Sequence, residues 1–259
     1  MNIKNNGGWH IMNTVNLLII TNIATLISLL IVTIYYKIPK QIIKKIIEPQ
    51  YGKHKFMKMV YNKLQGKGIL LDVGCGNNSP YYFKTNFPGI KYTGIDVGDY
   101  NQTKPILADD YIVASPENFA TKISKLENCF NIVVSSHNLE HCNDRNGTLI
   151  AMAKALKKGG YLYISFPTEE SVKFPGSRAG CLNYYDDSTH KDVPPIFSEA
   201  LQILKNNDIE IIFSRKSYKP FFYYIIGMAM EKKSKREKKV FYSAWAYYGF
   251  ETIIYGQKK

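Results

Sequence analysis

The stretch that most constrains this chain runs through residues 68–96, where a short apolar run leads into a glycine turn. An apolar run closed by turn residues is typical of a buried strand, and Ile69–Leu71 fits that description. Gly74 and Gly76 carry no Cβ, so the backbone of the turn can pass close to a ligand. A second strand ends on Asp96, and an acid in that place can accept hydrogen bonds from both hydroxyls of a ribose.

The turn departs from the fingerprint of dinucleotide-binding folds at its third glycine. The segment after Gly76 reads Asn77, Asn78 and Ser79, so a serine stands where that glycine is expected. This departure argues against a pyrophosphate packed on the start of the next helix. It favours a ligand that contains a nucleoside and no phosphates.

The run LDVGCGNNSP, followed by a strand that ends in an acid, resembles the first motifs of the class I S-adenosylmethionine-dependent methyltransferases. The later run LKKGGYLYISFP carries the resemblance on, so that it spans residues 68–167. It implies a Rossmann-like α/β fold, whose seven-stranded and mostly parallel sheet includes one antiparallel strand, and S-adenosylmethionine as cofactor. The residues expected against that cofactor are Asp72, Gly74, Cys75, Gly76, Asp96, Ser115, Glu117 and Ser136.

The remaining pattern alternates strands with helices, as the resembled fold requires. Predicted strands are 69–71, 91–95, 111–114, 130–135, 161–166, 209–213 and 250–255, and predicted helices are 83–87, 115–126, 148–157 and 197–206. The third strand is the least distinct. Ser115 and Glu117 follow it as a cofactor-facing pair or as simple helix capping, and Asp109 and Asp110 replace them if the strand begins earlier.

The amino-terminal part has a different composition. Residues 14–36 carry no charge and would span about 34 Å as a helix, which is enough for a bilayer core. A buried or interfacial helix is the alternative, because Asn16 and Asn22 interrupt the apolar run. Lysines concentrate after the run, which predicts a catalytic domain on the cytoplasmic side. The expected organisation is a tail (1–13), a transmembrane helix (14–36), a basic connecting region (37–66) and a methyltransferase domain (67–259) with a substrate loop (168–195).

The formal net charge of +13 implies an anionic neighbour, which can be a membrane surface, nucleic acid or an acidic substrate. A membrane explains the lysines after the hydrophobic run and the basic run 231–239, although a charge run is most often a solvated helix face. No face that combines aromatic and basic residues is evident, so nucleic acid is not an expected partner. The four cysteines show no paired spacing, which suits a reduced compartment.

The segment after the fourth strand contains His137, Glu140 and His141 in the spacing H-x-x-E-H, which binds zinc in some metallopeptidases. No third ligand is evident from the sequence, so no metal is expected. In similar methyltransferases this segment is a loop at the edge of the sheet, where His137 can act on the acceptor. Structural roles for Glu140 and His141 at a helix start are the alternative.

Residues 171–192 form a polar, aromatic segment that is too long for a simple connector. Aromatic faces beside polar side chains suit a sugar or another polyhydroxylated acceptor, so Arg178, Asn183, Tyr184 and Tyr185 are the expected acceptor-binding residues. The alternative is a solvated loop with the tyrosines packed on the core. A general base would assist methylation of a hydroxyl, and the candidates are His137, His190 and Asp187.

These observations predict a membrane-tethered methyltransferase that acts on a sugar hydroxyl or another small polar or lipid-linked acceptor. A thinner resemblance to enzymes of surface polysaccharide synthesis supports the sugar. Methylation of a membrane-soluble molecule such as a quinone, methylation of RNA, and a non-catalytic cofactor-binding module are the alternatives.

Overall fold

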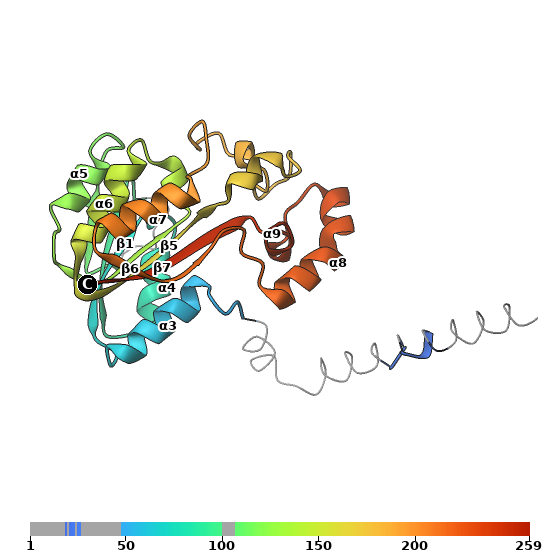
Figure 1. Cartoon of the computed structure of the whole chain (residues 1–259), viewed down its shortest axis with the longest axis horizontal. Helices are drawn as coiled ribbons and strands as arrows, with labels where there is room; N and C mark the ends of the chain where they lie inside the picture. The colour runs from blue at the N-terminus through green and yellow to red at the C-terminus, as the bar shows by residue number, and fades with distance from the viewer. Residues whose placement is uncertain (1–18, 20, 24, 27–47, 100–106) are drawn as a thin grey trace, which may run out of the picture. The chain divides into compact units, whose positions relative to one another are not determined.

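The computed structural model describes residues 19, 21–23, 25–26, 48–99 and 107–259 (Figure 1). The chain divides into two units, Met1–Glu48 and Pro49–Lys259. In the first unit the described residues between 19 and 26 are helical. No helix within the described ranges has the length and apolar content needed to cross a bilayer. The expected tail and most of the expected transmembrane segment lie outside the described residues, so both stay predictions.

The second unit contains a seven-stranded sheet with the order β3-β2-β1-β4-β5-β7-β6. All neighbours are parallel except β7, which runs antiparallel between β5 and β6. The strands are β1 (Gly68–Val73), β2 (Ile90–Asp96), β3 (Asp110–Val113), β4 (Phe130–Ser136), β5 (Leu156–Pro167), β6 (Ile209–Arg215) and β7 (Glu251–Lys258). The expected fold, including its antiparallel strand, is confirmed.

Helices cover both faces of this sheet (Figure 1). They are α3 (Lys53–Lys63), α4 (Ser79–Asn86), α5 (Phe119–Ser124), α6 (Arg145–Ala155), α7 (Phe197–Asn206), α8 (Phe221–Glu237) and α9 (Tyr242–Tyr248), with 3-10 turns η1 (Leu139–His141), η2 (Glu169–Lys173) and η3 (Tyr184–Asp186). Helices α5, α6 and α7 lie on one face, and α3 and α4 lie on the other. The α8–α9 pair stands at one end of the sheet.

Successive residues of the central strands pack into two separate hydrophobic cores, one on each face of the sheet. Leu71 and Val73 join the core under α5, α6 and α7, whereas Leu70 joins the core under α3 and α4. The same alternation continues in β5, where Leu162 faces the first core and Tyr163 the second. Because a strand places successive side chains on opposite faces, a sheet covered on both sides needs nearly continuous apolar runs. This need explains why these strands were visible in the sequence.

The segment around Ser115 differs from the prediction. The strand β3 begins at Asp110 and ends at Val113, and the helix α5 begins only at Phe119, not at Ser115. A turn precedes the helix, in which the Asn118 amide donates to the Ser115 carbonyl (3.0 Å). The chain therefore uses Ser115 in a turn rather than as the cap of a longer helix.

The helix α6 also ends earlier than predicted. It stops at Ala155, and Leu156 is already extended and paired with Phe130 of β4. Leu156 is fully buried, so its burial between the sheet and α6 favours the extended conformation over another helical turn. Lys157, predicted as the last residue of this helix, therefore belongs to β5.

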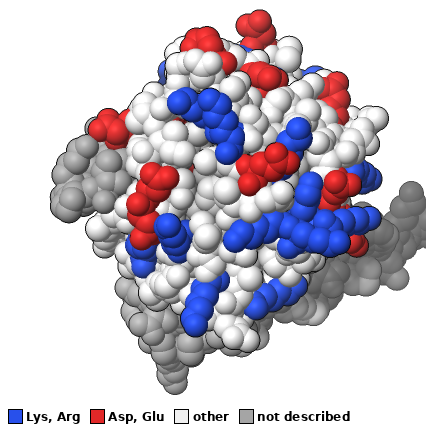
Figure 2. Space-filling model, turned by 90° about the vertical axis from the view of Figure 1, so that its left-hand side faces the viewer, with Lys and Arg blue, Asp and Glu red and all other residues white. Residues whose placement is uncertain are grey.

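The end of this unit that carries α5 and the carboxyl terminus shows both signs of charge (Figure 2). Lysine and arginine side chains form a band across the face, with aspartates and glutamates among them. In Figure 1 this face lies at the opposite end from α8 and α9. Part of the positive charge is therefore remote from the α8–α9 pair.

Candidate active site

The glycine turn connects β1 to α4 at the carboxyl edge of the sheet. The Gly74 amide donates to the Ile95 carbonyl (2.8 Å), which ties the turn to β2. Gly74 has φ +71°, and a Cβ added there would lie 2.3 Å from the Asn138 side chain. Gly74 is therefore required for contact with the segment that follows β4, a role that the sequence did not reveal.

Gly76 faces open space instead. Its φ is +51°, and a Cβ added there would find no protein atom within 4 Å. Its amide donates to Oδ2 of Asp96 (2.6 Å), so the turn and the acid at the end of β2 lie side by side. The open space over a glycine and beside a carboxylate fits a nucleoside whose ribose hydroxyls hydrogen-bond to the acid.

Asp96 is the expected ribose-binding acid. It is mostly buried, and its Oδ1 accepts from the Val97 amide (2.7 Å). Burial raises the pKa of Asp96, while the Gly76 and Val97 amides counteract this in part. Each carboxylate oxygen has two lone pairs, so both oxygens can still accept a hydrogen bond from a ribose hydroxyl.

The side chains of Asp72, which precedes the turn, and Cys75, which belongs to it, are buried. Asp72 accepts hydrogen bonds from Ser79 Oγ (2.5 Å) and Tyr92 Oη (2.8 Å), and burial raises its pKa. Burial and the nearby Asp72 raise the pKa of the Cys75 thiol to about 12. These contacts favour a supporting role for both side chains.

The tips of β3 and β4 supply the other residues expected against the cofactor. The Ala114 amide donates to the Asp96 carbonyl (2.9 Å), which places the exposed residues Ser115 and Glu117 directly after the tip of β3. Asp109 lies at the opposite end of that strand and accepts from the Tyr92 amide (2.7 Å). Ser136 ends β4, and its hydroxyl lies 3.0 Å from that of Ser165.

His137 follows β4 with φ +54° and lies between two carboxylates. Its Nδ1 is 3.2 Å from Glu140 Oε1, and its Nε2 is 3.6 Å from Glu251 Oε1. Burial disfavours the imidazolium, but hydrogen bonds and charges of Glu140 and Glu251 outweigh this effect and raise the pKa of His137 to about 10. His137 therefore holds its proton near neutral pH, which argues against the expected role as a general base. The rings of Trp245 and Phe250 each lie 6.1 Å from the imidazole.

The two other candidate bases lie in the loop 168–195, which was expected to bind the substrate. His190 Nδ1 is 2.6 Å from the Tyr184 carbonyl, and His190 Nε2 is 3.8 Å from Asp187 Oδ2. Asp187 Oδ1 accepts from the Thr189 amide (2.8 Å) and hydroxyl (2.6 Å). Burial would raise the pKa of Asp187, but these two hydrogen bonds and the electrostatic effect of His190 and His141 outweigh it and lower that pKa. The ring centroids of His190 and His141 lie 4.8 Å apart, so this loop packs against η1.

Three of the four expected acceptor-binding residues are engaged within the protein. The buried Arg178 guanidinium forms a two-point ion pair with Glu231 of α8 (2.8 and 3.0 Å). Asn183 caps η3 and donates to the Phe174 carbonyl (2.6 Å), and Tyr184 is fully buried. These contacts favour structural roles over acceptor binding for the three residues, whereas Tyr185 is 62% exposed.

Two residues that sequence reasoning missed hold the α8–α9 pair near this edge. Trp245 donates through Nε1 to the Cys181 carbonyl (3.0 Å) of the loop. Glu231 accepts from Arg178 and from Tyr248 Oη (2.7 Å). The sequence offered two signals for these residues. Trp245 is one of only two tryptophans in the chain, and Glu231 is the acid at the start of the basic run 231–239.

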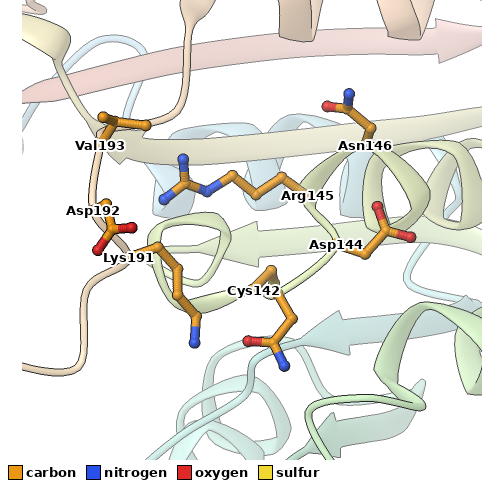
Figure 3. A pocket seen from close by; sticks show the side chains of 8 residues that line it. Cys142, Asp144, Arg145, Asn146, Lys191, Asp192 and Val193 are labelled. Atoms are coloured by element: carbon orange, nitrogen blue, oxygen red, sulfur yellow. The ribbon is translucent and has the colours of Figure 1, made fainter.

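A hollow of about 470 Å³ lies between the start of α6 and the end of the loop (Figure 3). The Arg145 side chain crosses it, but its guanidinium donates to the Leu139 carbonyl (3.0 Å) and to Tyr184 Oη (3.0 Å). Neither the glycine turn nor Asp96 lines it, so the hollow is separate from the expected cofactor site. The lining residues are Cys142, Asn143, Asp144, Arg145, Asn146, Lys191, Asp192 and Val193.

Comparisons with known proteins agree with a methyltransferase fold. The family model described as "Methyltransferase domain" matches residues 50–207. The chain is 29% identical over 154 residues to a ubiquinone biosynthesis O-methyltransferase of Pelagibacter ubique (strain HTCC1062). That match covers 55% of this chain and 61% of the relative, so the chain spans less than two thirds of the relative's length.

A solved S-adenosylmethionine-dependent methyltransferase from Mesorhizobium loti shares the fold. Its TM-score is 0.50 at 15% identity, and the match covers 80% of this chain and 99% of that one. The motifs, the sheet and the family match agree with one another. The chain therefore belongs to the methyltransferase domain family, with the fold of class I S-adenosylmethionine-dependent methyltransferases.

Proposed function

We propose that the protein transfers the methyl group of S-adenosylmethionine to a hydroxyl of a membrane-soluble acceptor, such as a reduced quinone, at the cytoplasmic face of a membrane. The observation that carries this proposal is the exposed apolar half of α8. Large apolar side chains there are 41–71% exposed, and they belong to Phe221, Phe222, Ile225, Ile226 and Met228.

The two halves of α8 differ in a way that suits a membrane surface. In the first half Gly227 packs so closely on α9 that an added Cβ would lie 2.0 Å from the Ser243 carbonyl oxygen, which leaves the apolar side chains outward. The second half carries exposed lysines and an arginine within residues 232–236, and two more exposed lysines, Lys238 and Lys239, follow the helix. Apolar side chains that enter the headgroup region and cations that meet anionic lipids are the two components of interfacial binding.

The same helix is connected to the site. Arg178 joins α8 to the substrate loop, and Trp245 of α9 lies beside His137 at the tip of β4. An acceptor that leaves the membrane along α8 would therefore meet the edge of the sheet that carries the cofactor site. The partly exposed ring of Trp245, which stacks on the buried Phe250, offers a flat face there for an aromatic acceptor.

The choice of a quinone-like acceptor over a sugar has two supports. The side chains that were expected to bind a sugar are largely engaged in the loop itself, as described above for Arg178, Asn183 and Tyr184. The curated relative is named for ubiquinone biosynthesis and for O-methylation. Both supports favour a hydroxyl on an apolar molecule.

Within this proposal, S-adenosylmethionine supplies a methyl group on a positively charged sulfur. The chain contributes Asp96 to hold the ribose and Gly76 to leave room for the nucleoside. His137, as an imidazolium, provides positive charge near the acceptor oxygen rather than a base. The predicted segment 14–36 and the lysines after it would keep the unit at the cytoplasmic membrane face.

The test is methyl transfer from labelled S-adenosylmethionine in phosphatidylglycerol vesicles. One set of vesicles carries a catechol with a polyprenyl tail, and a second set carries a polyprenyl-phosphate-linked sugar. We expect a methyl ether of the catechol by mass spectrometry, and less product from a short-chain catechol. Transfer to the sugar alone, or equal turnover of both catechols, would refute the acceptor class.

A further inference from the structure

Glu140, His141 and His190 come together although the sequence separates His190 from the other two. One ligand-type atom from each residue lies within 4.8 Å of the others. The H-x-x-E-H spacing supplies two of these side chains from η1, and the substrate loop supplies the third. We propose that this cluster, which we call the Glu–His–His cluster, binds a divalent transition-metal ion of the zinc class.

The hydrogen bonds fix which imidazole nitrogens are free. A carbonyl oxygen can only accept, so His190 Nδ1 carries the hydrogen that binds the Tyr184 carbonyl (2.6 Å). The Thr189 hydroxyl gives its hydrogen to Asp187 Oδ1 (2.6 Å), so it accepts from His141 Nδ1 (3.0 Å). In both neutral imidazoles the lone pair is therefore on Nε2. This is the arrangement of metal-binding histidines, which donate the other N–H to a carbonyl or polar group.

The oxygen partner is also suitable. Glu140 is 1% exposed, and its Oε1 binds His137 Nδ1 (3.2 Å). Its Oε2 is buried and has no hydrogen-bond partner among the described residues. A buried carboxylate oxygen without a partner is costly, and a cation would compensate for it.

A second carboxylate approaches the same atoms. His190 Nε2 lies 3.8 Å from Asp187 Oδ2, so a lone pair faces a negatively charged oxygen. A metal ion bound to His190 Nε2 would make this contact favourable. Two histidines and a carboxylate form the ligand set of many zinc and iron sites.

The distances require only a small adjustment. Zinc bonds of about 2.0–2.1 Å put neighbouring ligand atoms about 3.4 Å apart in a tetrahedral site. The cluster, at up to 4.8 Å, therefore has to close by about 1.4 Å. Side-chain rotations can supply a change of this size, and the partly exposed His141 gives a cation access to the cluster.

The role that we assign rests on the proposed O-methylation. The metal would bind the acceptor hydroxyl oxygen and lower its pKa, as a Lewis acid does. The hydroxyl proton leaves to solvent, and the oxygen forms a bond to the methyl carbon. The carbon–sulfur bond breaks at the same time, and its electron pair stays on sulfur.

The test measures metal binding directly, without turnover. Full-length protein stripped with a chelator is titrated with Zn²⁺, and its metal content is measured by mass spectrometry. We expect one Zn²⁺ per chain. His190→Asn and Glu140→Gln should each weaken binding by more than about 100-fold, because loss of an outer hydrogen bond alone costs 10–100-fold. Thr189→Val, which removes such an outer bond, should fall in that smaller range.

Controls separate this site from others. His54→Asn removes a histidine that pairs with Tyr82 Oη, away from the cluster, and should leave Zn²⁺ affinity unchanged. Binding of S-adenosylhomocysteine should persist in every variant, which shows that the cofactor site is folded. Protein loaded with Co²⁺ should show the visible absorption bands of nitrogen and oxygen ligands. It should show no charge-transfer band from a thiolate to cobalt. Failure to bind Zn²⁺, thiolate bands, or unchanged affinity in His190→Asn would overturn the metal site. Metal binding without catechol methylation would instead refute only the proposed acceptor.

Discussion

Substitution of Gly76 tests the cofactor site most selectively, because another glycine offers a matched control. Gly76 and Gly159 both have positive φ (+51° and +76°), and a Cβ added at either meets no protein atom within 4 Å. Gly76 lies beside Asp96, whereas Gly159 lies in the first part of β5, away from the turn. The variants Gly76→Ala and Gly159→Ala therefore introduce the same backbone strain in two different places.

The expected magnitudes follow from that comparison. An L-residue in the left-handed region costs about 1–2 kcal/mol, so both variants should lose that much free energy of unfolding in urea titrations. Only at Gly76 does the new methyl group enter space that we assign to the nucleoside. Overpacking of this kind costs about 1–3 kcal/mol, which corresponds to a loss of affinity of about 5–150-fold.

Calorimetric titration with S-adenosylhomocysteine measures this effect without turnover. Gly76→Ala should bind more weakly than wild type, and Gly159→Ala should bind equally well. If Gly76→Ala keeps wild-type affinity, the nucleoside does not lie over Gly76. If both variants weaken equally, the loss reflects general strain, and the reasoning is refuted.

Asp96→Ala should weaken binding of the cofactor by about 1–3 kcal/mol through lost hydrogen bonds, and unchanged calorimetric affinity would mean that other groups hold the ribose. Arg178→Met should lower stability to urea by about 2–4 kcal/mol, because it leaves Glu231 without its ion pair in a largely buried place. The double variant with Glu231→Met should recover most of that loss, and a further loss would contradict the pairing. Thiol reagents react with the thiolate, and a pKa of about 12 leaves Cys75 almost fully protonated at pH 8. Cys75 should therefore stay unlabelled at that pH, whereas the exposed Cys129 should react. Rapid labelling of Cys75 would contradict its burial.

The sequence was sufficient for the sheet because the sheet is buried on both faces. Strands such as β4 need a nearly continuous apolar run, the glycine turn must follow β1 directly, and Asp96 must end β2 to lie at the carboxyl edge. Both requirements are local, so both are visible in one sequence. The boundary near Leu156 was not, because burial against Phe130 decides it.

The acceptor side was less predictable for a related reason. Arg178 and Tyr184 had the composition of a binding surface, but their partners, Glu231 and Arg145, lie far along the chain. A polar side chain in a loop can bind a ligand or the protein itself, and only the fold distinguishes these cases. Separation along the chain also explains why the sequence did not reveal the third member of the Glu–His–His cluster. His190 lies 49 residues after His141, and only the folded loop places their imidazoles 4.8 Å apart.

The central claim is that the edge formed by the glycine turn and Asp96 accepts a sulfonium nucleoside without phosphates. Calorimetry on the purified full-length chain tests it with two titrants, S-adenosylmethionine and NAD. We predict one S-adenosylmethionine bound per chain and no measurable binding of NAD. No binding of S-adenosylmethionine, or tighter binding of NAD, would contradict the claim.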